Sequence, residues 1–223
     1  MGRVWKIPTA SLSAATLLKT KADRSVICSV VPKANAMLQN RLPFPILWVD
    51  HITARVSIRY PKPATIGADR LANAAAAVSL GKLPAIVVDF GTAVTFDVID
   101  SAGCYLGGII APGLATAASA LHERTALLPL TRIQRINSPI GKSTRQGIQI
   151  GLLLGAIGIV REVVARITRE SFGGKLPTVI ATGGDAELVA RLALENGSSK
   201  VIDIVDPLLT LRGLQVIAAN QYT

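Results

Sequence analysis

The chain is poor in aromatic residues, carries few cysteines and has no apolar run long enough to cross a membrane. Aromatic side chains make up 4% of its 223 residues, so aliphatic side chains must fill the core. The longest apolar stretch, residues 148–160, is interrupted by glycines and falls short of the roughly 18 residues that a span requires. We therefore expect a tightly packed core helix there and no membrane partner.

The cysteines and the first residues bear on the cellular compartment. Cys28 and Cys104 form neither a metal-ligand spacing nor a disulfide framework, which is typical of a protein in a reducing compartment. Arg3 and Lys6 lie near the start of the chain, but no apolar core or cleavage site of a secretory signal accompanies them. The sequence thus predicts a cytoplasmic location.

The formal net charge is +10, yet the basic residues are scattered singly along the chain. A nucleic-acid surface would need clustered Lys and Arg, and a platform for single strands would also need interleaved aromatic side chains. We therefore expect no nucleic-acid partner, and instead a general attraction for ligands that carry phosphate. Half of the residues are hydrophobic, which is enough to build one large domain or two small ones.

The most informative run is V-V-D-F-G-T-A-V-T, residues 87–95. A buried strand here ends in the carboxylate of Asp89, turns at Gly91 and then presents the hydroxyls of Thr92 and Thr95. Phosphate sites use this combination, because glycine lets backbone N–H groups approach an anion, hydroxyls donate hydrogen bonds and a carboxylate holds a metal ion. An ordinary turn whose polar side chains bond only nearby backbone fits the same residues.

A second polar cluster, Gly67-Ala68-Asp69-Arg70, lies twenty positions upstream of that run. It opens an alanine-rich segment that predicts a helix over residues 70–80, so Asp69 lies at a helix N-terminus. The helix dipole and the free N–H groups there stabilise a carboxylate anion. Asp69 is therefore either a simple first-turn residue or a general base that accepts a proton from an attacking hydroxyl.

The order of the expected elements suggests a duplicated unit. We expect strands over residues 4–8, 25–31, 46–49, 56–60, 85–89, 95–100, 105–110 and 178–182, and helices over 9–19, 33–39, 70–80, 113–122, 147–169, 185–196 and 208–219. From residue 85 they form an antiparallel meander followed by helices, and a shorter set of strands and helices precedes it. Gly107-Gly108 and Pro112-Gly113 are interpreted as turns that close the meander in preference to direct ligand contacts. Gly183-Gly184 fits a nucleotide contact and a strand end equally well.

An ordered set of motifs makes the chain similar to the type III pantothenate kinases. The motifs are Y-x-x-P at 60–63, G-A-D-R at 67–70, D-F-G-T-A-x-T at 89–95, Y-L-G-G-x-I-x-P-G at 105–113, L-P at 128–129, I-G-K-S-T at 140–144, A-T-G-G at 181–184 and D-P-L-L-T-L-x-G-L at 206–214. Each motif alone is weakly specific, whereas the ordered set spans nearly the whole chain.

The resemblance implies an α/β fold of duplicated actin-like (ribonuclease H-like) domains, as in the ATPase and sugar-kinase group, with mixed sheets flanked by helices. An incomplete N-terminal domain would cover residues 1–80 and a C-terminal domain residues 81–223. The implied activity is ATP-dependent phosphorylation of pantothenate to 4'-phosphopantothenate, the first step of coenzyme A biosynthesis. The implied partners are pantothenate, ATP and a second copy of the chain in a homodimer.

The resemblance also assigns roles to residues of this sequence. Asp69 would be the catalytic base, Thr92 would contact ATP, and Asp89 would hold a monovalent cation, K⁺ or NH₄⁺. Hydrated Mg²⁺ would accompany ATP as the phosphoryl donor. The pantothenate shell would consist of Tyr60, Gly67, Ala68, Asp69, Arg70 and Thr144.

Two departures from the family pattern bear on these expectations. Lys62 stands where the family usually has asparagine in Y-x-N-P. The family also opens with a phosphate loop, D-x-G-N-T, whereas Met1 to Thr9 resembles the segment that follows it. The first domain is thus expected to lack its N-terminal hairpin, through a misplaced start or a shortened sequence, and a chain without it would turn over ATP poorly. The alternatives are an inactive homologue that serves as a ligand-binding or regulatory module, and another small-molecule kinase or phosphatase of the actin-like group.

Overall fold

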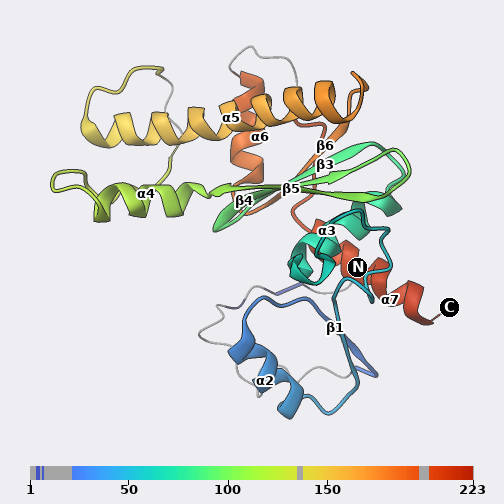
Figure 1. Cartoon of the computed structure of the whole chain (residues 1–223). Coiled ribbons are helices and arrows are strands. Elements are labelled where there is room, and N and C mark those ends of the chain that lie inside the picture. The colour runs from blue at the N-terminus through green and yellow to red at the C-terminus, as the bar shows by residue number, and fades with distance from the viewer. Residues whose placement is uncertain (1–3, 6, 8–21, 135–137, 196–200, 223) are drawn as a thin grey trace. The chain divides into compact units, whose positions relative to one another are not determined.

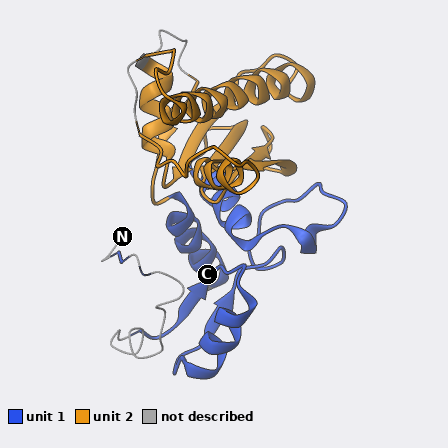
Figure 2. Ribbon diagram, turned by 90° about the vertical axis from the view of Figure 1, so that its left-hand side faces the viewer, with its two compact units in different colours: residues 1–80, 209–223 blue, residues 81–208 orange. Residues whose placement is uncertain are grey.

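The computed structural model describes residues 4–5, 7, 22–134, 138–195 and 201–222. The chain forms two compact units (Figures 1 and 2): unit 1 comprises Met1–Leu80 with Leu209–Thr223, and unit 2 comprises Gly81–Leu208. The chain therefore passes from one unit to the other after residue 80 and returns after residue 208. The helix predicted over residues 9–19 and part of the strand predicted over 4–8 lie outside the described residues.

Unit 2 is a five-stranded mixed sheet with helices against it. The strands are β3 (Ala85–Phe90), β4 (Ala93–Ile99), β5 (Tyr105–Pro112), β6 (Thr178–Gly183) and β7 (Ile204–Val205), in the order β5-β4-β3-β6-β7. The β3–β4 and β4–β5 pairs are antiparallel, whereas β3–β6 and β6–β7 are parallel. The helices are α4 (Leu114–Glu123), α5 (Thr144–Ser171) and α6 (Ala186–Glu195). The predicted α/β class, a mixed sheet flanked by helices, is confirmed.

The core of unit 2 follows from strands that are apolar on both faces. Successive side chains of a strand point to opposite faces, and Ile86, Val88 and Phe90 of β3 join a buried cluster with residues of α5 and α6. The intervening Val87 is also fully buried, so β3 is a central strand covered on both sides. Asp89 is the polar exception, and it lies one residue before the end of β3.

The glycine pair of the meander lies elsewhere than expected. Gly107 and Gly108 are inside β5, and the interpretation of these two residues as a closing turn is wrong. Gly107 has a φ of +127°, close to an irregularity of register between Val98 and Ile99 in the β4–β5 pair. A β-bulge of this kind places an extra residue in one strand and favours glycine at the distorted position. The sequence shows the two glycines, but it does not show the irregular pairing of β4 with β5, at which Gly107 adopts a positive φ.

Unit 1 combines a small sheet with two packed helices. Its elements are β1 (Ser25–Ile27), α2 (Pro32–Arg41), β2 (Ile46–Trp48), the 3₁₀ turn η2 (Pro63–Thr65), α3 (Ala68–Ser79) and α7 (Leu209–Tyr222). β1 and β2 form a parallel pair. Residues 56–60, predicted as a strand, do not form a continuous one, and only Ile58 among them makes an isolated β-bridge.

The α3–α7 pair is held by a close approach at Gly213. A side chain on Gly213 would collide with the carbonyl of Ala72, so the two helix backbones touch at this point. The sequence grouped the closing helix with residues 81–223, whereas the structure packs α7 on α3 in unit 1. Contacts between segments far apart in sequence decide this grouping, and they leave no local signal in the sequence.

Helix α5 buries one side and exposes glycines on another. By length and composition it is long and apolar enough to cross a membrane, a test that core helices of soluble proteins also pass. Ile148, Leu153, Ile157 and Val160 are buried in unit 2, yet only 33% of the most apolar window is buried. The expectation of a tightly packed core helix therefore holds for one face of α5 only.

Candidate functional site

Asp69 lies in the first turn of α3, directly after the N-cap residue Gly67 and Ala68. Its carboxylate is half-buried, and Oδ1 accepts a hydrogen bond of 2.8 Å from the backbone N–H of Arg70. The first N–H groups of a helix have no partner within the helix, and the positive end of the helix dipole lies there. The position therefore favours a negative charge and leaves part of the carboxylate accessible.

Gly67 supplies the space that this carboxylate occupies. A Cβ atom on residue 67 would lie 2.6 Å from Asp69 Oδ1, closer than non-bonded atoms approach. The φ of Gly67 is −59°, which any residue adopts, so backbone strain is not the reason for glycine here. The G-x-D spacing of the sequence thus has a steric basis: the glycine lets the Asp69 side chain fold back over the start of its own helix.

The Cys28 thiol, just after β1, is the neighbour of this carboxylate on the side of the small sheet. Burial and then the negative charge of Asp69 raise the pKa of the Cys28 thiol to about 11. The thiol consequently stays protonated and uncharged near neutral pH, and it does not add a second anion beside Asp69. Sequence reasoning assigned Cys28 no place in the site, because it is 41 positions before Asp69 in the chain.

The other expected pantothenate residues of unit 1 lie around the same helix start. Ala68 is buried, with 9% of the residue exposed. Arg70 is half-buried beside Asp69, whereas Tyr60 lies in the preceding loop and is 39% exposed. In that loop the Lys62 carbonyl accepts hydrogen bonds from the backbone and the hydroxyl of Thr65, at 3.0 and 2.7 Å, which closes the η2 turn.

Unit 2 carries a row of oxygen ligands across three neighbouring strands. Asp89 is paired in register with Thr95 of β4 and with Thr182 of β6. Residues paired in register point to the same face of a sheet, so the carboxylate has a hydroxyl on either side. Thr182 is 2% exposed, whereas Asp89 and Thr95 are half-buried. β3 and β6 are parallel, so this row lies near the carboxyl ends of both strands, where open α/β sheets bind ligands.

The end of β6 is fitted to Asp89 by a second glycine. Gly183 has a φ of +92°, and a Cβ atom there would lie 2.5 Å from Asp89 Oδ1 and from the carbonyl oxygen of Phe90. The backbone N–H of Asp185 then donates to the same Phe90 carbonyl at 3.3 Å. Gly184, in contrast, has open space at its missing side chain. The sequence allowed this glycine pair to be a strand end or a nucleotide contact. The structure shows that Gly183 ends β6, and a nucleotide contact at Gly184 stays a prediction.

The turn that carries Thr92 is fixed from the N-terminus of α4. The Thr92 carbonyl accepts hydrogen bonds from the Gly113 N–H at 3.0 Å and from the Thr116 hydroxyl at 2.6 Å. A side chain on Gly113 would collide with the backbone of Gly91 and Thr92. Gly91 and Thr92 are themselves exposed. The turn therefore has a fixed backbone and a free outer face, and Gly113 and Thr116 are the supporting residues that sequence reasoning missed.

Thr144 is the first residue of α5 and is exposed. The preceding Ser143 is the N-cap, and its hydroxyl accepts a 3.3 Å hydrogen bond from the Gln146 N–H. The Gln146 side chain in turn accepts from the N–H of Lys142, one residue before the N-cap, at 2.8 Å, an arrangement close to a capping box. The motif I-G-K-S-T is thus a helix start. Thr144 and Asp89 belong to unit 2, and Asp69 to unit 1.

The described residues limit which ions the Asp89 row suits. They contain no group of three or more His, Cys, Asp or Glu side chains that holds a metal ion. The row offers one carboxylate with hydroxyl and carbonyl oxygens, which suits a hard cation that keeps most of its ligands from water or phosphate. A zinc-type site, which needs three or four nitrogen, sulfur or carboxylate ligands, does not fit these residues.

Known proteins similar to this chain agree on one family. A sequence model described as type III pantothenate kinase matches residues 6–166. A type III pantothenate kinase of Akkermansia muciniphila is 43% identical over 219 residues, which cover 96% of this chain and 87% of the relative. Another, from Methylacidiphilum infernorum, is 38% identical over 217 residues, or 95% of this chain and 78% of the relative.

A solved structure from Campylobacter jejuni, described as a Baf family transcriptional activator, has a similar fold. Its TM-score is 0.65 at 21% identity, and the match covers 95% of this chain and 90% of that chain. At this identity the likeness shows the fold alone. The predicted α/β fold is thus shared with a solved structure over nearly the whole chain. The duplicated actin-like arrangement stays a prediction. From the family match and the identity to its members, the chain belongs to the type III pantothenate kinase family.

Proposed function

We propose that this chain transfers the γ-phosphoryl group of ATP to the primary hydroxyl of pantothenate and forms 4'-phosphopantothenate, the first step of coenzyme A biosynthesis. The observation that carries the proposal is the Asp69 carboxylate, which lies at the start of α3 over Gly67 in a chain of the pantothenate kinase family. The free thiols of Cys28 and Cys104 fit a cytoplasmic enzyme.

Asp69 acts in this proposal as the general base. The pantothenate hydroxyl oxygen forms a bond to the γ-phosphorus while the bond from that phosphorus to the β–γ bridging oxygen breaks. ADP leaves with the electron pair, and the hydroxyl proton passes to the Asp69 carboxylate. Phosphoryl transfer depends mainly on positioning and on neutralised charge, so the fixed side-chain geometry at Gly67 is the relevant property.

The pantothenate shell consists of residues with distinct contributions. The half-buried Arg70 guanidinium suits the pantothenate carboxylate, because its planar donors match two oxygens at once. Gly67 and Ala68 offer backbone groups at the helix start, and Tyr60 offers a phenol from the loop before it. Thr144, at the N-terminus of α5, adds a hydroxyl beside free N–H groups, which favour an anion.

The nucleotide side of the reaction falls to unit 2. The exposed Thr92 donates to ATP from a turn whose backbone Gly113 and Thr116 hold in place. Asp89, between Thr95 and Thr182, holds a monovalent cation, K⁺ or NH₄⁺, and Mg²⁺ accompanies the phosphates. When bound, these cations neutralise negative charge that spreads over the phosphate oxygens. The protein residues meanwhile fix the position of the nucleotide.

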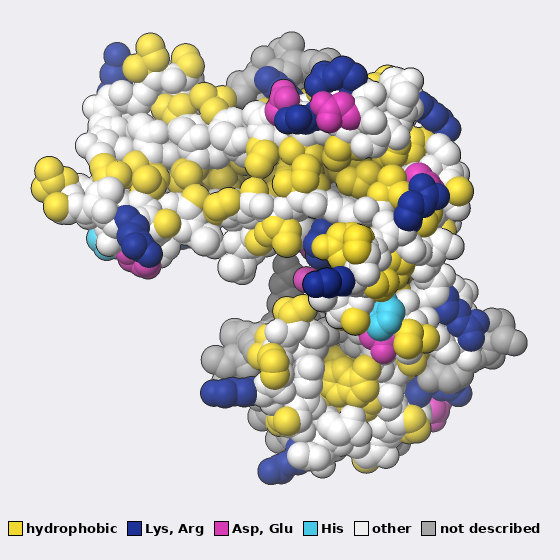
Figure 3. All heavy atoms as spheres, in the orientation of Figure 1, with side chains coloured by type: hydrophobic (Ala, Val, Ile, Leu, Met, Phe, Trp, Pro, Cys, Tyr) yellow, Lys and Arg dark blue, Asp and Glu magenta, His cyan; other side chains and the backbone are white. Residues whose placement is uncertain are grey.

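We further propose that the chain forms a homodimer through the glycine face of α5, which we define as Gly147, Gly151, Gly155 and Gly158. All four are exposed, and a Cβ atom at any of them would meet nothing within 4 Å. Each glycine inside a helix costs about 1 kcal/mol relative to alanine, and a close approach by another backbone offsets that cost. Leu154, 48% exposed, lies among them, and Figure 3 shows hydrophobic side chains gathered along α5 and α4.

The first prediction concerns the base. Asp69→Asn keeps the size of the side chain but cannot accept the proton, so we expect kcat to fall about 100- to 10,000-fold. A coupled assay for ADP release measures this change, and titration calorimetry with pantothenate should show nearly unchanged binding. The matched control is Asp23→Asn, an exposed carboxylate of the same unit, which should keep wild-type kcat. Full turnover by Asp69→Asn would remove Asp69 from the base role, and an inactive wild type that binds pantothenate would favour a non-catalytic homologue.

The second prediction concerns the cation. Residues that only orient a metal ligand change cation affinity about 10- to 100-fold, so loss of the Asp89 carboxylate should cost at least about tenfold. Titration of the rate with KCl should therefore show weaker activation in Asp89→Asn, with pantothenate affinity unaltered. Glu170→Gln, an exposed carboxylate on α5 in the same unit, is the control. An unchanged KCl dependence in Asp89→Asn would contradict the assignment.

The third prediction concerns the dimer. In a single chain the side chain of Gly151→Leu would occupy open space. In the proposed dimer it would push the two α5 backbones apart, so sedimentation equilibrium should show at least tenfold weaker self-association. Ala165→Leu is the control, since residue 165 is exposed on the same helix beyond the glycine face. A wild-type chain that stays monomeric at micromolar concentration, or a Gly151→Leu variant that dimerises like wild type, is incompatible with this surface.

A further inference from the structure

The motif at residues 206–214 lies outside every site described above, and the structure shows what two of its residues contact. Thr210 is in the first turn of α7, and its hydroxyl donates a 2.8 Å hydrogen bond to Oδ1 of Asn73 in α3. Three residues later, Gly213 lets the α7 backbone touch Ala72. Both contacts therefore join α7 to the helix whose first turn contains Asp69.

The surface of α3 around Asn73 consists of small side chains. Five of the six residues from Ala72 to Ala77 are alanines, and all six are buried. Helices pack by fitting ridges of side chains into grooves, and a row of methyl groups forms only shallow ridges. The register of the two helices therefore depends on specific contacts, here the close approach of Gly213 to Ala72 and the Thr210–Asn73 hydrogen bond.

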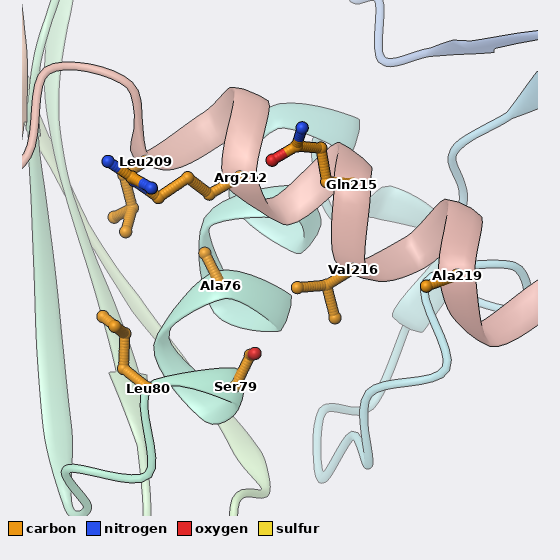
Figure 4. Close-up of a pocket in the computed structure, with 8 residues that line it drawn as sticks. All are labelled: Ala76, Ser79, Leu80, Leu209, Arg212, Gln215, Val216 and Ala219. Atoms are coloured by element: carbon orange, nitrogen blue, oxygen red, sulfur yellow. The ribbon is translucent and has the colours of Figure 1, made fainter. Parts of the chain in front are cut away.

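One flank of the helix pair is also not filled. A cavity of about 380 Å³ opens there, lined by Ala76 and Leu80 of the α3 end and by Leu209 and Val216 of α7, among others. Figure 4 shows these side chains around the space between the two helices. Because close packing is missing on this flank, the register of α3 against α7 depends more strongly on specific contacts such as the Thr210–Asn73 hydrogen bond.

Asn73 is the buried polar residue within this alanine surface, with 0% of its side chain exposed. A buried polar group is costly when a partner is removed, and one buried polar pair is known to select a single register between helices whose apolar contacts permit several. The Thr210–Asn73 pair therefore distinguishes one placement of α3 on α7 from the neighbouring ones.

The register of α3 is also the placement of Asp69. Asn73 follows Asp69 by four residues, which is about one helical turn, so both lie on similar faces of α3. A slip of α3 by a single residue would displace Asp69 by about 1.5 Å along the axis and about 100° around it. A general base must stay within hydrogen-bond reach of its proton, so a slip of this size removes the base from its position.

We propose that the Thr210–Asn73 hydrogen bond is a positioning contact, which fixes α3 against α7 and thereby holds Asp69 where it accepts the proton. This inference rests on the function proposed above for Asp69. Thr210 and Asn73 act through Asp69 and are positioning residues rather than catalytic ones. The chain enters unit 2 after α3 and returns before α7.

The test compares Thr210→Val, which keeps the shape but loses the donor, with Thr210→Ser, which keeps the donor. Since a misplacement of about 1 Å costs about 100-fold in rate, we expect Thr210→Val to lower kcat about 10- to 100-fold with the KM for ATP nearly unchanged. Thr210→Ser should restore kcat to near the wild-type value. Thr125→Val, at an exposed hydroxyl in unit 2, is the control. Rates are compared well below each unfolding midpoint.

A second readout follows the position of Asp69 without catalysis. The Asp69 charge contributes to the raised pKa of the Cys28 thiol, so a displaced Asp69 changes the rate at which iodoacetamide alkylates Cys28 at pH 9. Thr210→Val should change this rate in the wild-type background and leave it unchanged when Asp69→Asn is also present.

Wild-type kcat in Thr210→Val would overturn the proposal, and so would equal losses in the Val and Ser variants, which indicate general destabilisation. If the wild-type chain itself transfers no phosphoryl group to pantothenate, the proposed function fails and the alkylation experiment alone decides the positioning claim. In that case, the positioning claim is overturned if Thr210→Val leaves the alkylation rate of Cys28 unaltered in a chain that still carries Asp69.

Discussion

Each of the two candidate carboxylates lies over a glycine, and the geometry of both half-sites depends on the side chain that the glycine lacks. Asp69 Oδ1 occupies the space above Gly67, and Asp89 Oδ1 occupies the space above Gly183. In the first case the glycine belongs to the same helix start, and in the second to the neighbouring parallel strand. Two unrelated local structures thus place a carboxylate in the space that a missing side chain leaves. At Gly67 this space is the only reason for glycine, whereas Gly183 also has a positive φ that favours glycine.

Each glycine–carboxylate pair is in turn supported by packing that lies farther along the chain. The parallel pairing of β3 with β6 brings Thr182 and Gly183 beside Asp89, and α4 fixes the Thr92 turn through Gly113. In unit 1, α7 packs against α3, whose first turn contains Asp69. A phosphoryl-transfer enzyme depends more on fixed positions of its side chains than on their reactivity. Contacts from α4, β6 and α7 that fix these side chains suit that requirement.

The sequence predicted the local parts of this arrangement well. The run that ends in Asp89 was recognised as a buried strand because five of its six residues are apolar and a glycine follows, and Asp69 was recognised at a helix start because alanines follow it. The strand expected over residues 56–60 is reduced to an isolated bridge at Ile58, and the short β7 was missed. The length of a strand depends on the partner that pairs its backbone groups, and a single segment does not reveal that partner. The fit of Gly113 to the Thr92 turn, the bulge at Gly107 and the contact of Cys28 with the Asp69 charge were invisible for the same reason. They depend on segments that meet only in the folded chain. From the sequence, only the family resemblance indicated that such segments form one site.

The most direct measurement of the central claim is the fate of the γ-phosphoryl group. The chain is incubated with ATP, MgCl₂, KCl and pantothenate and followed by ³¹P NMR. The account predicts that the γ-phosphate resonance is replaced by a new phosphomonoester resonance, with ADP formed in equal amount and only when pantothenate is present. ADP with inorganic phosphate and no phosphomonoester, or no loss of ATP at all, would contradict it.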